Sequence, residues 1–150
     1  PGIREYTVTP GEKTTTISGK GKAGLKQEEN YYFFYLPVCY KGITGKSYAY
    51  YNTSRSKNLY LPASVDENYS YDIQLPENLT LCTPIQEKKI DNPIGSFKIT
   101  LTSEGSSLHI ELALQIKKQL ITPAEYPAFR SLITEWTDRT RKPILFKTVQ

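Results

Sequence analysis

The residues that could carry out hydrolytic chemistry are few in this chain. Cys39, His109 and Asp138 follow one another in an order that some thiol hydrolases use. A nucleophilic cysteine needs a stabilised thiolate, commonly from a helix N-terminus and a paired histidine. Cys39 lies instead in an aromatic segment typical of a strand, and His109 lies on the polar side of an alternating segment. The pattern therefore favours scattered structural residues over a catalytic triad, and we predict no catalytic residue.

The two cysteines, Cys39 and Cys82, allow two interpretations. A disulfide between them would stabilise the fold by about 4 kcal/mol if loop closure sets the gain. Two buried free thiols that pack as small hydrophobic groups are the alternative. Spacing alone does not decide between these interpretations, because a disulfide also requires a specific geometry.

The sequence offers few residues that could bind a metal ion or a cofactor. The chain has one histidine and two cysteines, and its acidic residues do not cluster at metal-ligand spacings. His109 and Glu111 share a predicted strand face, but two groups do not make a metal site. We therefore expect no metal and no cofactor.

The charge distribution argues against nucleic acids and membranes as partners. The net charge is +4 and the isoelectric point is near 9.0, but the basic residues are spread along the chain. Nucleic-acid binding usually needs a denser basic stripe. No apolar run approaches the roughly 18 residues that indicate a transmembrane helix. We expect a monomer that binds no nucleic acid and inserts into no membrane.

Tyrosine is the compositional outlier, with 12 of the 150 residues. It is favoured on half-buried strands and at hydrated interfaces. Tyr48, Tyr50 and Tyr51 lie in a predicted loop over 41–58 that is rich in glycine, serine, asparagine and lysine. Rigid aromatic tips on an adaptable loop suit an interface or a ligand contact. Such a loop could bind a neighbouring domain, or a glycan or peptide.

Alternation of apolar and polar residues predicts the strands. It is strongest over 108–116, where five in-phase apolar residues oppose polar ones, and it recurs over 69–75 and 96–102. A turn at Gly105 should join the segments 96–102 and 108–116 as an antiparallel hairpin. The nearly continuous apolar run over 31–40 suits a strand that is buried on both faces.

One helix is predicted near the C-terminus, over about 123–137. Its apolar residues lie three to four positions apart and so share one face: Tyr126, Phe129, Ile133 and Trp136. The preceding Thr-Pro-Ala-Glu sequence has the pattern of a helix start with a capping box. Pro127 removes one intrahelical hydrogen bond, which allows an irregular first turn or a later start. We expect this helix to be a structural anchor on the sheet.

These elements predict a single, mainly β domain over 1–150, an antiparallel β-sandwich with one C-terminal α-helix. Residues 1–20 are polar and rich in glycine, lysine and threonine, which suggests a loosely ordered lead-in or linker strand. The chain has no methionine and opens on Pro1 and Gly2. We therefore expect a domain excised from a larger chain, with any signal segment lying upstream.

Several segments between residues 20 and 147 form a recognisable set: 24–26, 31–37, 59–62, 69–76, 92–97 and 121–130. The most specific is the Tyr-Pro-Ala-Phe-Arg sequence at 126–130. Together they resemble the C-terminal domain of unknown function that follows the transglutaminase-like cysteine protease core in secreted bacterial proteins.

The resemblance implies a parent protein with an N-terminal β-rich domain, a central Cys-His-Asp core and this domain, exported to the periplasm or the cell exterior. The catalytic motif of that core, a cysteine that opens a helix, has no match here, so no catalytic residue is carried over. We therefore expect a non-catalytic accessory domain that packs on or positions the catalytic core of the same chain. A glycan- or peptide-binding module that uses exposed tyrosines is the alternative.

Overall fold

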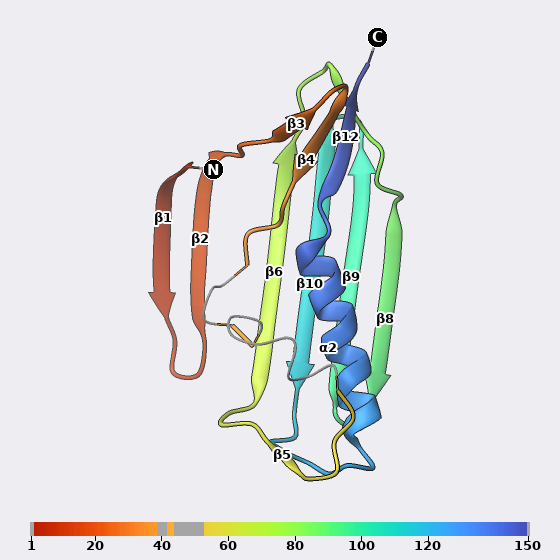
Figure 1. The fold of residues 1–150 in the computed structure, drawn as a ribbon. Coiled ribbons are helices and arrows are strands. Elements are labelled where there is room, and N and C mark those ends of the chain that lie inside the picture. Colours follow the sequence, from red (N-terminus) through yellow and green to blue (C-terminus); the bar gives the residue numbers. More distant parts are fainter. Residues whose placement is uncertain (1, 39–41, 44–52, 150) are drawn as a thin grey trace.

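The largest sheet of the fold, here called the main sheet, is antiparallel and has the strand order β6–β10–β9–β8 (Figure 1). Its strands are Val65–Gln74 (β6), Gln86–Asn92 (β8), Gly95–Glu104 (β9) and Ser107–Ile116 (β10). The structure is a computed structural model, and it describes residues 2–38, 42–43 and 53–149. β9 and β10 pair along their whole length, which confirms the predicted hairpin. Gly105 opens its two-residue turn with φ +57°, a value that glycine adopts without strain.

One face of the main sheet is apolar because every second residue of its central strands points inward. These inward residues are at most 2% exposed: Phe97, Ile99, Leu101, Leu108, Ile110, Leu112, Leu114 and Ile116. The same face starts at Gly95, where an added Cβ would lie 1.9 Å from the backbone oxygen of Gln115. The two strands therefore approach each other at that point more closely than a larger residue allows.

A second sheet, here called the small sheet, covers one half of this apolar face (Figure 1). Its order is β3–β4–β12–β7, with Lys26–Glu28 (β3), Tyr31–Phe34 (β4), Leu79–Leu81 (β7) and Ile144–Thr148 (β12). Phe34, Ile144 and Phe146 pack in one cluster with Leu108 and Ile110 of the main sheet. This half of the domain is therefore the predicted antiparallel sandwich.

The helix α2, Tyr126–Arg141, covers the other half of the apolar face (Figure 1). Its predicted anchor residues Tyr126, Phe129, Ile133 and Trp136 are all at most 3% exposed. They share a cluster with the remaining inward residues of β9 and β10. The fold is therefore mainly β with a C-terminal helix, and the helix completes the layer that the small sheet leaves open.

The helix lies later in the chain than the predicted range of 123–137. Thr122 and Glu125 do interact, because the Thr122 N–H and Oγ1 donate to Glu125 Oε2 at 3.1 and 3.0 Å. This contact closes a turn before the helix, and Glu125 becomes the N-cap residue. Pro127 then lies in the first helical turn, where a missing N–H costs nothing. At its other end the helix continues to Arg141. A proline disfavours the helical conformation only in the residue directly before it, and Lys142, which precedes Pro143, is extended.

Over its described part, residues 31–38, the apolar run predicted over 31–40 is not a strand buried on both faces, and that prediction is wrong there. β4 ends at Phe34, which is 8% exposed, whereas Tyr31 and Tyr35, which point to the other side, are 45% and 53% exposed. The small sheet packs on the main sheet with one face only, and the other face of β4 meets solvent. Near the opposite end of the molecule, Leu59–Tyr60 (β5) pairs with Leu120–Ile121 (β11).

Residues 2–22 form a hairpin of Gly2–Pro10 (β1) and Thr15–Lys22 (β2). In the described part of the chain these strands pair only with each other (Figure 1). Val8 lies directly opposite Ile17, and Tyr6 lies two residues away on the same face. Between residues 5 and 20 the opposite face carries polar side chains: Glu5, Thr7, Thr9, Thr16, Ser18 and Lys20. The hairpin is therefore amphipathic, yet its apolar face is exposed.

The anchoring role of α2 can be tested at Trp136, the only tryptophan of the chain. Trp136→Ala should lower the free energy of unfolding by about 3–5 kcal/mol, because it leaves a large cavity between the helix and the main sheet. Urea denaturation followed by circular dichroism measures the change. Thr134→Ala, at an exposed position of the same helix, is the control and should change stability little. A solvent-like Trp136 emission maximum in the folded wild-type chain would contradict the burial.

Candidate functional site

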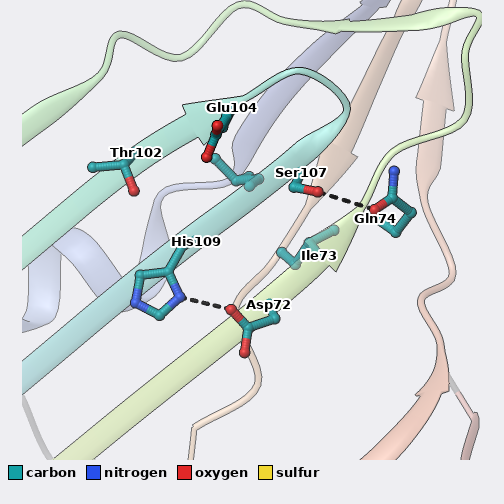
Figure 2. Close-up of a pocket in the computed structure, with 8 residues that line it drawn as sticks. Asp72, Ile73, Gln74, Thr102, Glu104, Ser107 and His109 are labelled. Atoms are coloured by element: carbon teal, nitrogen blue, oxygen red, sulfur yellow. Dashed lines mark hydrogen bonds and ion pairs between the residues drawn. The ribbon is translucent and has the colours of Figure 1, made fainter.

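A polar network lies on the outer face of the main sheet, the face opposite to α2. His109 of β10 lies directly across from Asp72 of β6 and Thr102 of β9 in the strand register. Its side chain alternates with the inward Leu108 and Ile110, so it points outward. Figure 2 shows His109 and Asp72 turned toward each other from neighbouring strands.

The charged groups of this network form a chain across three strands. His109 Nδ1 lies 2.7 Å from Asp72 Oδ1, and His109 Nε2 lies 3.7 Å from Glu111 Oε1. Glu111 Oε2 accepts a hydrogen bond from Lys98 Nζ on β9 at 2.9 Å. Opposite charges therefore alternate from Asp72 to Lys98, and each pair is exposed enough to contribute little stability.

The same contacts shift the protonation of the network. The hydrogen bond to Asp72 raises the pKa of His109, with a smaller contribution from Glu111. The hydrogen bond from Lys98 lowers the pKa of Glu111. A raised pKa favours the protonated imidazole, which is the form that pairs with the two carboxylates. The electrostatics therefore favour an ion pair at His109.

The network borders a hollow of about 300 Å³ at the end of the β9–β10 hairpin. Its lining includes Gln74, Thr102 and Ser107, and Ser107 Oγ donates to Gln74 Oε1 at 3.1 Å (Figure 2). Within the described residues, no hydroxyl or thiol hydrogen-bonds to His109. The arrangement can make polar contacts to a partner surface, but it lacks an activated nucleophile in the part of the chain that the structure describes.

The described members of the hypothetical thiol-hydrolase triad lie on opposite sides of the main sheet. His109 points to the outer face, whereas Asp138 belongs to α2, which covers the inner face. Asp138 instead accepts a hydrogen bond from Lys142 Nζ at 2.9 Å. Cys39 lies outside the described residues. The sheet therefore keeps this histidine and this aspartate from acting together.

Cys82 is half-buried, and its Sγ lies 4.0 Å from the carbonyl oxygen of Thr80. Its predicted disulfide partner, Cys39, is outside the described residues, and the pairing stays a prediction. The loop tyrosines Tyr48, Tyr50 and Tyr51 also lie outside them. Their proposed role as interface or ligand contacts therefore stays a prediction too.

Two tyrosines of β6 use their hydroxyl groups for hydrogen bonds within the chain. Tyr71 Oη donates to the carbonyl oxygen of Pro37 at 2.5 Å, and burial raises the pKa of Tyr71. Tyr69 Oη donates to Glu67 Oε2 at 3.0 Å, and the other carboxylate oxygen of Glu67 accepts the Ile43 N–H at 2.6 Å. These contacts tie the segment before and within the 41–58 loop to the main sheet.

A second concave surface, here called the helix groove, lies between α2 and the segment at 54–55. It has a volume of about 520 Å³, and its lining includes Arg55, Ile90, Tyr126 and Arg130. The groove could not be predicted from the sequence, because Arg55 and Arg130 are far apart in the chain and neither belongs to a motif. Nothing in the sequence around Arg55 indicates that it will contact Tyr126 at the start of the helix.

Metal chemistry finds no support at either surface. Among the residues that the structure describes, no three histidine, cysteine or acidic side chains come together in a way that could hold a metal ion. No helix in the described ranges is long and apolar enough to cross a membrane.

The chain matches the family described as Domain of Unknown Function with solved-structure structure (DUF3858) over residues 30–146. It is also similar to the crystal structure of a putative protease from Parabacteroides distasonis, with a TM-score of 0.69 and 31% sequence identity. This similarity covers 81% of the chain but only 24% of the Parabacteroides protein. No curated protein matches the chain.

The ion pair of His109 can be tested by proton NMR, because the chain has one histidine. The pKa of His109 should lie above its usual value of 6.5, and Asp72→Asn should lower it. Since the folded-state pKa is the higher one, the pair stabilises the fold below pH 6.5, and this contribution is lost as the pH rises through the folded-state pKa. Asp66→Asn, on the same strand but bonded to Asn68 and Gln115, is the control and should leave the titration unchanged. A wild-type pKa at or below 6.5 would contradict the pairing.

Proposed function

We propose that this chain, which belongs to the DUF3858 family of domains of unknown function, serves as a non-catalytic accessory domain of a larger protein. The observation that carries the proposal is the coverage of the Parabacteroides protein. A domain like this one accounts for 24% of that chain, so it is found there beside a much longer remainder. The proposal places the domain after a transglutaminase-like catalytic core, in an exported bacterial protein, and has it pack on that core.

The β1–β2 hairpin supports such a contact. No residue of the hairpin takes part in the two buried clusters of the domain, so the described domain buries its hydrophobic core without it. Its apolar face nevertheless exposes Tyr6 by 71%, Val8 by 49% and Ile17 by 65%. An isolated two-stranded hairpin is only marginally stable in water, and burying an apolar side chain contributes about 1.5–3 kcal/mol. A neighbouring domain that covers this face would therefore stabilise the hairpin.

The hairpin also lies where a contact with a neighbour is expected. It precedes the residues that match the family, 30–146. Interfaces between domains of one chain typically bury about 600–1,500 Å² and combine apolar with polar contacts. The apolar face of the hairpin and part of the polar outer face of the main sheet would together supply such a surface. The proposal assigns the apolar contact to Tyr6, Val8 and Ile17.

The docking can be tested with the parent protein and with its separated catalytic core. Val8→Asp combined with Ile17→Asp places two charges in the proposed interface. The affinity of the chain for the core should fall by at least about tenfold, and the melting temperature of the parent should drop. Calorimetric titration of the two pieces and a thermal melt of the parent measure these changes.

The control for the hairpin uses its opposite face. Thr7→Asp combined with Thr16→Asp adds the same charges to the same strands but leaves the apolar face intact. This variant should bind like the wild type. If wild-type pieces do not associate, and deleting the domain changes neither the activity nor the melting temperature of the parent, the docking proposal is wrong.

A glycan-binding module is a second candidate, and one observation favours it. Tyr31 and Tyr35 are 45% and 53% exposed, and with the half-buried Phe33 they alternate along the outer face of the small sheet. Exposed aromatic faces in a row suit stacking on sugar rings.

This candidate predicts binding on a glycan array by the isolated chain, lost when Tyr31 and Tyr35 are both changed to alanine. Tyr60→Ala, at an exposed tyrosine of β5 near the opposite end of the molecule, is the control and should keep the binding. An array without hits would remove the glycan candidate.

A further inference from the structure

We propose that the helix groove binds an extended peptide segment that carries acidic side chains. The groove is bounded on one side by Ser54 and Arg55 and on the other by the first turns of α2. Its volume of about 520 Å³ is within the range of ligand sites and larger than that of the hollow beside His109. The proposal goes beyond the accessory role, because it concerns a different surface and does not require the domain to dock on a catalytic core.

Arg55 is the first argument for an anionic ligand. Its guanidinium lies over the Tyr126 ring, 5.8 Å from the ring centroid, which fixes it at the wall of the groove. The residue is half-buried, yet within the described residues its side chain makes no ion pair and no hydrogen bond. A guanidinium has five N–H donors, and partly removing them from water favours pairing with a carboxylate.

Arg130 supplies a second cation on the opposite wall. It lies one helical turn after Tyr126 and is exposed. Among the residues that the structure describes, it also has no acidic partner. Among the described lining residues the acidic one is Glu135, which is already paired, since its Oε1 lies 2.5 Å from Lys88 Nζ and its Oε2 lies 3.9 Å from Arg139 Nε. The described lining of the groove therefore carries two arginines, Arg55 and Arg130, without an acidic partner in that part of the chain.

The floor of the groove indicates a peptide and not an acidic glycan. Ile90, Pro123 and Pro127 line it with apolar surface, and Ser131 and Thr134 add hydroxyl groups along the helix. Tyr126 is 3% exposed and Arg55 lies over its ring, so it offers no free ring face to a sugar. Apolar side chains of an extended peptide can contact this floor while its carboxylates reach the two arginines.

The test uses the 150-residue chain and fluorescein-labelled nonapeptides. The probe alternates glutamate with leucine and proline, and its matched partner has glutamine in place of each glutamate. We expect the glutamate peptide to bind with a dissociation constant that rises with salt, and the glutamine peptide to bind at least about tenfold more weakly. Arg55→Gln combined with Arg130→Gln should weaken glutamate-peptide binding by at least about tenfold, whereas Arg55→Lys combined with Arg130→Lys should retain part of it.

The control variant is Lys147→Gln, which removes a positive charge from the exposed side of β12, at the other end of the molecule (Figure 1). It should bind the glutamate peptide like the wild type, and circular dichroism should show that every variant is folded. Equal binding of the two peptides, or binding that the double glutamine variant retains, would overturn the proposal. Arginine-dependent binding of oligogalacturonate without binding of the glutamate peptide would overturn it in favour of an acidic glycan.

Discussion

The apolar face of the main sheet determines the rest of the architecture. Along β10 its inward residues run without a break from Leu108 to Ile116, and all are almost fully buried. The small sheet packs over Leu108 and Ile110, and α2 packs over the remaining part. Each such side chain contributes about 1.5–3 kcal/mol when buried. Uncovering either half would therefore cost an amount comparable to the whole net stability of a domain, and both covers are needed.

This constraint explains where the candidate functional surfaces lie. The small sheet and α2 cover the inner face of the main sheet. Side chains that can contact a partner are therefore left on the outer face, at the edges of the small sheet and α2, and on the hairpin. The network of Asp72, His109 and Glu111 lies on the outer face, and its contacts are internal ion pairs. The helix groove lies at such an edge, where α2 begins and where Arg55 and Arg130 have no acidic partner in the described part of the chain. The hairpin carries an apolar face that the hydrophobic core of the domain does not use.

The parts of the fold that depend on local periodicity could be predicted from the sequence. The in-phase residues of β10 and the stripe from Tyr126 to Trp136 each require burial against one surface, so element type and inward face follow directly. The helix boundaries could not be predicted as well, because Thr122 and Glu125 form the contacts of a capping box one turn before the helix. The burial of β4 on both faces was predicted wrongly, because a run of aromatic residues has the same composition whether one face or both faces of the strand are buried. The helix groove depends on tertiary placement of Arg55 beside Tyr126, for which the sequence carries no local signal.

The central claim is that the domain serves a neighbour in its own chain, and hydrogen exchange tests it most directly. Amide exchange of residues 2–22 should be followed by mass spectrometry in the isolated chain and in the full-length parent. In the isolated chain the hairpin should exchange fast, since both of its faces meet solvent and it pairs with no other described strand. In the parent we predict slow exchange of the same amides, because a neighbouring domain covers Tyr6, Val8 and Ile17. Equal, fast exchange in both proteins would contradict the account.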